Sequence, residues 1–219
     1  ENVWKKYQPL GVELAQNQPL GFTGLPKDGL IILGLNPSSR SDVEEVGTDG
    51  DINVIELKNS DIIKNDDDGD GYHNGLRRVT EEIKKFSEIQ DLPWGHVDLF
   101  CFRETRAKKA KEQIYKDWNF FWEQMVAVKE YIDASNPKVI LTNNAFTSDL
   151  ILKYWLKEDD DDKEPIFDMD IGTYIYNEKI PIFLSGMLSG QSSLDKGNRT
   201  RLAWQIGRHF KSTTSATRY

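Results

Sequence analysis

The chain has 219 residues, of which 38% are hydrophobic, and this length is typical of one α/β domain with a sizeable core. Its formal net charge of −8 argues against a basic nucleic-acid-binding surface over the whole molecule, and its single cysteine excludes an intrachain disulfide. No apolar run approaches the roughly 18 residues of a membrane-spanning helix, and no signal segment is recognised. We therefore expect a single domain over residues 1–219, cytoplasmic and monomeric.

The most informative element lies early in the chain, where an apolar run enters a tight turn. Residues 30–35 are Leu-Ile-Ile-Leu-Gly-Leu, a pattern typical of a strand buried on both faces. Gly34 allows close backbone approach, Pro37 stiffens the turn, and Asn36 projects at the carboxyl end of the strand. Open α/β sheets bind their ligands at that end, so the turn predicts a site that contains Asn36.

The remaining elements alternate between strands and helices. Apolar runs predict further strands at residues 96–102, 138–141 and 180–184, with a short strand at 53–57. Residues 173–180 either form an edge hairpin or lead into the last strand. Apolar stripes predict helices at residues 75–87, 112–134, 144–156 and 195–210, the last with Asp195 at its N-terminus. The long stretch 38–74 is expected to form a wall over the Asn36 site. This order predicts a three-layer α/β/α fold around a central, mainly parallel four-stranded sheet.

Four segments together resemble the uracil-DNA glycosylase superfamily, as a divergent member. The Gly34-Leu35-Asn36-Pro37 turn resembles its Gly-x-Asn-Pro motif, and residues 97–103, 138–144 and 183–191 resemble the segments that follow it, in the same order. The resemblance spans about residues 30–210. It implies a DNA base-excision hydrolase that cleaves the N-glycosidic bond of a damaged or deaminated base, with DNA as partner and without a cofactor.

The resemblance also implies a role for individual residues. Asn36 would hold the attacking water, and in such a fold we expect His73, a residue the family pattern does not itself supply, to assist departure of the base as a second catalytic residue. The base pocket would be lined by Gly34, Leu35, Pro37, Tyr72, Asp98 and Phe100. DNA would be contacted by Ser38, Ser39, Ser185, Met187, Leu188, Ser189, Gln191 and Arg199, with Met187 and Leu188 as the apolar wedge that replaces the extruded nucleotide.

Two departures from the family pattern narrow this hypothesis. The last loop, residues 185–191, lacks the His or Asn that meets the leaving base, and His73 is the candidate replacement. Asp98 stands where relatives place an Asn that contacts the base edge. A carboxylate only accepts hydrogen bonds unless it is protonated, so Asp98 favours an amino-bearing edge over the carbonyl of uracil.

Structural interpretations stay open beside each functional one. Asn36 could cap its own turn, and Asp98 could pair with Arg103 or Arg106. The same fold could bind nucleic acid or a nucleotide without catalysis, or serve a small-molecule or protein partner, which the net charge favours. Basic residues nevertheless gather in 103–111 and 196–218, while acidic residues gather in 66–70 and 158–162, so a local basic groove remains compatible with the acidic average.

Motifs for binding a metal ion or a nucleotide are weaker in this sequence than the four glycosylase-like segments. Asp66-x-Asp68-x-Asp70-Gly71 begins like a calcium loop, but Arg77 occupies the position of the bidentate Glu. His96 and His209 have no metal-ligand spacing and are interpreted as structural, so no metal site is predicted. The sequence contains neither a Gly-x-Gly-x-x-Gly motif nor a P-loop.

Overall fold

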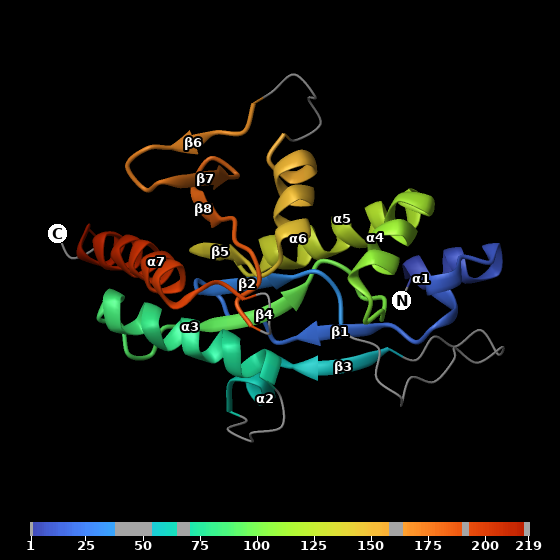
Figure 1. The fold of residues 1–219 in the computed structure, drawn as a ribbon, viewed down its shortest axis with the longest axis horizontal. Helices are drawn as coiled ribbons and strands as arrows, with labels where there is room; N and C mark the ends of the chain where they lie inside the picture. The colour runs from blue at the N-terminus through green and yellow to red at the C-terminus, as the bar shows by residue number, and fades with distance from the viewer. Residues whose placement is uncertain (1, 38–53, 65–70, 158–163, 190–192, 217–219) are drawn as a thin grey trace.

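A computed structural model describes residues 2–37, 54–64, 71–157, 164–189 and 193–216. Its main feature is a six-stranded sheet in the order β4-β2-β5-β8-β7-β6, with helices on both of its faces (Figure 1). The mixed α/β fold class is therefore confirmed. The expected number of four strands is wrong, because two antiparallel strands extend the parallel part of the sheet.

The parallel part contains the four strands that the apolar runs predict. β2 (Leu30–Gly34) lies between β4 (Trp94–Asp98) and β5 (Val139–Thr142), and β8 (Ile180–Phe183) follows β5. Every residue of these strands is buried, which explains why their sequences are almost continuously apolar. β4 begins two residues earlier than predicted, at Trp94. It also ends earlier, because residues 99–102 leave regular strand geometry after Asp98.

The antiparallel extension is the edge hairpin, one of the two forms expected for residues 173–180. β7 (Thr173–Tyr176) pairs with β8, and the short β6 (Phe167–Asp168) pairs with β7 at the edge. Asn177 and Glu178 form the turn between β7 and β8, and both have positive φ angles, 48° and 60°. Two consecutive left-handed residues are typical of the turns that match the twist of a hairpin.

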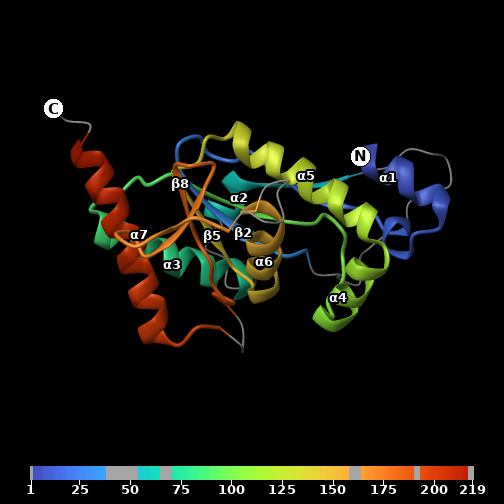
Figure 2. The same ribbon diagram turned by 90° about the horizontal axis from the view of Figure 1, so that it is seen from above.

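Two long helices cover one face of the sheet. α3 (Gly71–Ser87) and α7 (Lys196–Ala216) pack on each other so closely that a Cβ on Gly207 would lie 2.6 Å from Cβ of Phe86. At the start of α7, Oδ1 of Asp195 accepts a hydrogen bond of 3.0 Å from the Asn198 backbone N–H, which confirms the predicted acidic N-terminus. Figure 2 shows this helix pair and α5 on opposite sides of the strands.

The second face is covered by helices that are shorter than predicted. The expected helix 112–134 is two helices, α4 (Ala107–Lys116) and α5 (Trp118–Ala134), which meet at the non-helical Asp117. The expected helix 144–156 is α6 (Ala145–Leu150) followed by a π-helical turn, η3 (Ile151–Trp155). Trp118 of α5 packs on Tyr154 of η3, with ring centroids 4.7 Å apart.

A small second sheet lies beside β4. It consists of β1 (Leu20–Thr23) and β3 (Ile55–Lys58), which pair in parallel, and α2 (Asn59–Lys64) follows β3. β3 confirms the short strand predicted at 53–57, displaced by about two residues. The chain begins with α1 (Asn2–Tyr7) and two short turns, η1 (Gln8–Leu10) and η2 (Glu13–Gln16), and the Tyr7 hydroxyl donates to Glu123 of α5 over 2.8 Å.

Asn59 joins the small sheet to the main one. Its buried side chain donates to the carbonyl oxygens of Thr23 and His96, both 3.1 Å away, and accepts from the His96 backbone N–H over 2.6 Å. The amide thus satisfies backbone groups of β1 and β4 as a neighbouring strand would. Within the part of the chain that the structure describes, no helix is long and apolar enough to cross a membrane.

Candidate functional site

The strand order places the candidate site at the carboxyl ends of β2, β4 and β5. The chain passes from β2 to β4 on one side and later returns to β5 on the other side of β2. Such a reversal leaves a crevice at the carboxyl edge of the strands, where open α/β sheets bind ligands. Asn36, Asp98 and Asn143 lie at or just beyond these ends.

Asn36 is half-buried, and both hydrogens of its side-chain amide are engaged by the backbone. Nδ2 donates to the carbonyl oxygen of Pro37 over 2.9 Å and to that of Glu104 over 2.8 Å. These bonds fix the orientation of the amide, because a flipped group would turn its oxygen towards two carbonyls. Oδ1 is then the atom of Asn36 that remains to accept a hydrogen bond. The same bonds give Asn36 the turn-bracing role that the sequence left open.

The turn after β2 is held against the segment that follows β4. The backbone N–H of Leu99 donates to Gly34 and that of Phe100 to Leu35, over 3.0 and 2.9 Å, and Glu104 donates to Pro37 over 3.3 Å. The side chains of Leu35, Phe100 and Pro37 are buried. These predicted pocket residues therefore form the support beneath Asn36, and they offer a ligand little of their side-chain surface.

Asp98 faces His96, two residues earlier on the same strand. Nε2 of His96 lies 3.3 Å from Oδ1 of Asp98, and the two side chains are 0% and 5% exposed. Nδ1 of His96 lies 3.0 Å from the carbonyl oxygen of Ile32 on β2. The described partner of Asp98 is thus His96, while Arg106 instead lies 3.6 Å from Glu104. Arg103, the other partner considered for Asp98, is itself buried.

His73 lies in the first turn of α3, against the ring of His96. Its ring centroid is 5.8 Å from that of His96, in an edge-to-face arrangement. A Cβ on Gly75 would lie only 2.4 Å from Cβ of Ser189, so the start of α3 also touches the loop after β8. The structure therefore brings His73, Asp98 and the last loop together at one end of α3. Tyr72 belongs to the same helical turn, and its side chain is outside the described part.

Hydrogen bonds hold the loop after β8 against the carboxyl end of β5. The Ser185 backbone N–H donates to Oγ1 of Thr142 over 2.7 Å, and the Leu188 N–H donates to Oδ1 of Asn143 over 2.6 Å. Ser185, Leu188 and Ser189 are buried, with Leu188 only 2% exposed. The prediction of Leu188 as an exposed wedge is therefore not met in this conformation. Met187 is half-buried and is the apolar side chain that remains for that role.

Other predicted contact residues lie elsewhere or outside the described ranges. Arg199 of α7 binds Glu82 of α3, with its Nε 3.1 Å and its Nη2 3.0 Å from Oε1, so it bridges the two helices. Three predicted DNA contacts and the calcium-like segment lie outside the described residues: Ser38, Ser39, Gln191 and residues 66–70. Among the residues described, no group of three His, Cys, Asp or Glu is arranged to hold a metal ion.

Charged side chains flank the Asn36 turn at the start of α4. Burial acts to raise the pKa of Glu104, but the hydrogen bond from the Arg106 backbone and the nearby Lys109 outweigh it and hold the pKa below 4.5. Lys109 also binds Glu13 over 2.8 Å. Two cations of this segment, Arg106 and Lys108, have side chains that are 76% and 92% exposed.

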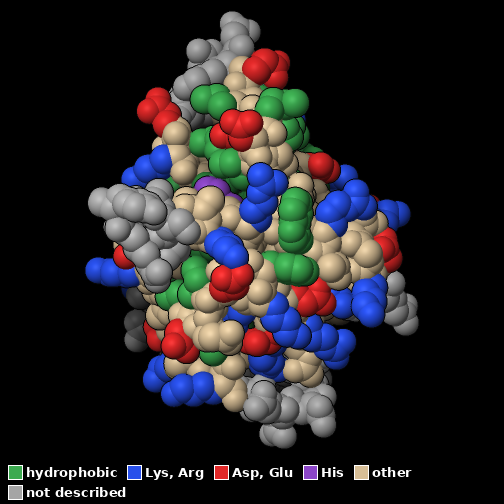
Figure 3. Space-filling model, turned by 90° about the vertical axis from the view of Figure 1, so that its left-hand side faces the viewer, with side chains coloured by type: hydrophobic (Ala, Val, Ile, Leu, Met, Phe, Trp, Pro, Cys, Tyr) green, Lys and Arg blue, Asp and Glu red, His purple; other side chains and the backbone are tan. Residues whose placement is uncertain are grey.

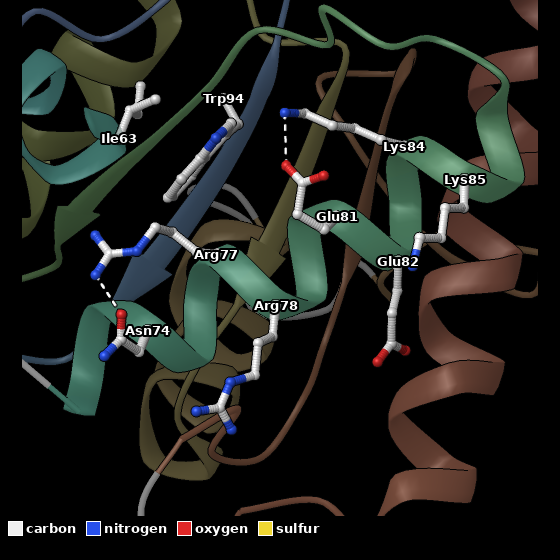
Figure 4. A pocket seen from close by; sticks show the side chains of 9 residues that line it. All are labelled: Ile63, Asn74, Arg77, Arg78, Glu81, Glu82, Lys84, Lys85 and Trp94. Carbon is white, nitrogen blue, oxygen red and sulfur yellow. Dashed lines mark hydrogen bonds and ion pairs between the residues drawn. The ribbon is translucent and has the colours of Figure 1, made fainter. Parts of the chain in front are cut away.

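Two surface hollows lie away from the strand ends. One, of about 570 Å³, is lined by α2, α3 and Trp94, and two of its four cations, Arg77 and Lys84, are bound to neighbouring groups (Figure 4). Arg77 donates to Asn74 and to the carbonyl oxygen of Ile62, and Lys84 lies 2.8 Å from Glu81. The bond to Ile62 joins α3 to α2, and the other two lie within α3, so we interpret this hollow as a packing gap between helices and not as a ligand site.

The other hollow, of about 380 Å³, separates the turn before β7 from α7 and is lined by Met169 and Trp204 among others. Figure 3 shows the end of the molecule that carries α7, where Lys and Arg are interspersed with Asp and Glu. This face of the molecule therefore has no continuous basic surface that could bind a nucleic-acid backbone.

The contact between His96 and Asp98 is what the sequence interpretation did not anticipate; it took His96 as structural, and the fully buried ring agrees with that. The signal was the position of His96 two residues before Asp98 on a predicted strand, because residues i and i+2 share one face. The chain matches no model of a known protein family, and no curated protein matches it. The functional argument therefore depends on the geometry at the strand ends.

Proposed function

We propose that the protein is a DNA base-excision hydrolase of the uracil-DNA-glycosylase type, which cleaves the bond between a base and its deoxyribose. The observation that carries the proposal is the fixed amide of Asn36 at the carboxyl end of β2. Because Nδ2 is held by two backbone carbonyls, Oδ1 has one orientation and is available to accept a hydrogen bond from water. A water held in one orientation is what attack on the sugar carbon requires.

The remaining groups fit the other half of the reaction. Bond cleavage leaves positive charge on the sugar and negative charge on the departing base, which needs a donor beside it. His73 supplies that donor in the proposal, since it lies at the N-terminal turn of α3 beside His96 and the last loop. Asp98, at the end of the adjacent strand, would contact the edge of the extruded base.

DNA is the proposed partner, and the exposed start of α4 is the proposed backbone contact. Arg106 and Lys108 extend into solvent within four residues of Glu104, whose carbonyl binds Asn36. Cations beside the site would bind phosphates, and the binding would weaken as salt increases. Met187 would fill the space left by the flipped nucleotide.

A second candidate function is binding of nucleic acid or a nucleotide without cleavage. Two observations favour it: the Asn36 amide already has a structural task in its turn, and Leu188 is buried. This candidate predicts salt-sensitive binding and no product.

The test is incubation of the purified protein with oligonucleotides that contain uracil, hypoxanthine or modified amino-bearing bases, followed by alkali cleavage. The proposal expects strand cleavage at one of these bases and a loss of at least about 100-fold in the Asn36→Ala variant. Absence of cleavage at every base, or equal activity of wild type and variant, would contradict it. Binding without cleavage would favour the second candidate.

A further inference from the structure

α4 carries positive charge on an acidic protein, with four lysines and one glutamate among its ten residues. Lys108, Lys111 and Tyr115 are spaced three and four residues apart, so they form one stripe along the helix, and all three are exposed. Glu112, the acidic residue of the helix, lies 3.9 Å from Nζ of Lys108. The stripe therefore combines cations with an aromatic ring on a helix that begins beside the Asn36 turn.

An aromatic pair at the end of this stripe joins α4 to α6. Tyr115 is 54% exposed, and its ring centroid lies 6.0 Å from that of Phe146 in a tilted arrangement. Nζ of Lys111 lies over the Phe146 ring, 4.9 Å from its centroid. Phe146 is half-buried, so it supports both side chains from one side. Much of Tyr115 is left open to solvent, and a ring held in this way loses little freedom when it binds a ligand.

The stripe lies close to the candidate site, on elements that themselves hold site residues. The carbonyl oxygen of Glu104, in the segment that leads into α4, binds Nδ2 of Asn36 over 2.8 Å. Phe146 lies in the first turn of α6, three residues after Asn143, whose side chain accepts from the Leu188 N–H of the last loop. α4 and α6 lie next to each other in both ribbon views (Figures 1 and 2). DNA bound at the strand ends would therefore have this stripe beside it.

We propose that Lys111 and Tyr115 bind unpaired nucleotides next to the site, with the ammonium group on a phosphate and the Tyr115 ring stacked on a base. The inference rests on the proposed function, which brings DNA to this edge of the sheet, and it adds a surface for a single strand. Cations combined with exposed aromatic rings are typical of surfaces that bind single-stranded nucleic acid, because every base has a flat face that can stack.

The ring of Tyr115 decides between this ligand and two others. An acidic peptide would also suit the lysines of α4, but it would leave the ring without a flat partner. In a duplex the bases are already paired and stacked on one another, so Tyr115 would have no base to contact. A single strand supplies both a phosphate for Lys111 and a free base for Tyr115.

The experiment measures dissociation constants of the full chain for fluorescein-labelled oligonucleotides by anisotropy. The ligands are a dT strand of about 15 nucleotides, an abasic strand of the same length and a blunt duplex. Wild type is expected to bind the dT strand at least about tenfold more tightly than the abasic strand, since the two share their phosphates and only one has bases. Tyr115→Ala is expected to weaken dT binding about tenfold and to leave abasic and duplex binding unchanged, whereas Tyr115→Phe keeps wild-type affinity.

The phosphate contact is tested by the dependence of dT binding on salt. Lys111→Ala is expected to reduce the slope of log affinity against log salt by about 0.7, the value of one phosphate contact on a single strand. Lys179→Ala removes an exposed lysine between β7 and β8 and should leave the slope unchanged. Trp204→Ala removes an exposed aromatic ring and should leave dT affinity unchanged, because α7 and α4 lie at opposite ends of the molecule (Figure 1). Thermal melting checks that each variant folds.

Equal binding of dT and abasic strands by wild type, wild-type dT affinity of Tyr115→Ala, or an unchanged salt slope of Lys111→Ala would overturn the inference. Displacement of the dT strand by polyglutamate as effectively as by unlabelled dT strand would also overturn it, since the surface would then recognise charge alone. If Tyr115→Ala does not fold, Tyr115→Leu replaces it with the same expected loss.

Failure of the proposed function is distinguishable from failure of this inference. A protein that binds the dT strand through Tyr115 and releases no base from any lesion has the surface and lacks the reaction. A protein that releases a base, and whose Tyr115→Ala variant binds the dT strand as wild type does, has the reaction and lacks the surface.

Discussion

Nδ2 of Asn36 lies 2.8 Å from the carbonyl oxygen of Glu104, and this bond joins the turn after β2 to the segment that leads into α4. The two residues are far apart in the sequence, and they are held by elements on neighbouring strands. The bond gives the turn its shape and gives the Asn36 oxygen its direction. A single side chain therefore has both a structural and a proposed catalytic task.

Replacement of Asn36 by Asp should destabilise the protein, although a carboxylate is the stronger base. A carboxylate cannot donate to Pro37 and Glu104, and it would place charge beside their carbonyl oxygens, at an expected cost of about 1–3 kcal/mol in the free energy of unfolding. Asn144→Asp is the matched control. Asn144 caps α6 by accepting from the Phe146 and Thr147 N–H groups, a task that Asp performs equally well. If urea unfolding shows the same loss of unfolding free energy in Asn36→Asp and Asn144→Asp, the assignment of the Asn36 amide as a donor to Pro37 and Glu104 is contradicted.

Replacement of Gly75 by Ala should also destabilise, although Ala is the better helix former by about 1 kcal/mol. The new Cβ would lie 2.4 Å from Cβ of Ser189 and 3.1 Å from the carbonyl oxygen of Leu188. Separating α3 from this loop should cost about 1–3 kcal/mol and outweigh the helix preference. At Gly186, a Cβ would meet its nearest neighbour at 3.8 Å, so Gly186→Ala should leave the melting temperature almost unchanged. A higher melting temperature for Gly75→Ala would show that the contact is absent.

The two apolar residues of the last loop should respond differently to truncation. Leu188 is 2% exposed, so Leu188→Ala should lower the free energy of unfolding by about 2–5 kcal/mol. Met187 is half-buried, and Met187→Ala should cost less stability while it weakens binding to duplex DNA, as measured by fluorescence anisotropy. Unchanged DNA affinity of Met187→Ala would remove this residue from the proposed wedge.

Glu104 should make stability depend on pH in the acidic range. Burial acts to raise its pKa, but Arg106 and Lys109 hold the pKa below 4.5 in the folded protein, so the folded state binds fewer protons than the unfolded one. This contribution is complete above about pH 4.5 and is lost as the pH falls through the lower folded pKa. Glu104→Gln should therefore lose less stability than wild type when the pH falls from 6 to 3. The measurement is the urea midpoint of each protein at both pH values.

The control for this measurement is Glu178→Gln, because Glu178 is an exposed turn residue for which no ion pair is described. Its pH profile should follow that of wild type. A Glu104→Gln profile that coincides with wild type as well would contradict the role of Glu104.

The parallel strands were predictable because burial on both faces leaves a continuous apolar run, as in residues 30–35. The break at Asp117 was not predictable, since apolar residues continue at helical spacing on both sides of it, from Ile114 to Trp118. β1 was missed because it has only four residues, too few for the alternation of Leu20 and Phe22 with Gly21 and Thr23 to stand out in the sequence. Propensity and periodicity describe local structure, and these features depend on what each segment packs against.

The candidate site was predictable in part for the same reason. Asn36 was identified because a strand end followed by Pro marks its position in the chain. The contact of His73 with His96 joins α3 to β4, and the Gly75 contact joins α3 to the loop after β8, so neither pattern is local. The position of Leu188 likewise depends on Asn143, the residue after β5, whose side chain accepts from the Leu188 N–H.

The most direct measurement is release of free base from lesion-containing DNA under single-turnover conditions, followed by mass spectrometry of the product. The account predicts that wild type releases a base and leaves an abasic site, and that Asn36→Ala does so at least about 100-fold more slowly while it remains folded. Wild-type protein that binds the DNA and releases no base would contradict the proposed reaction, as would a folded Asn36→Ala variant that releases base at the wild-type rate.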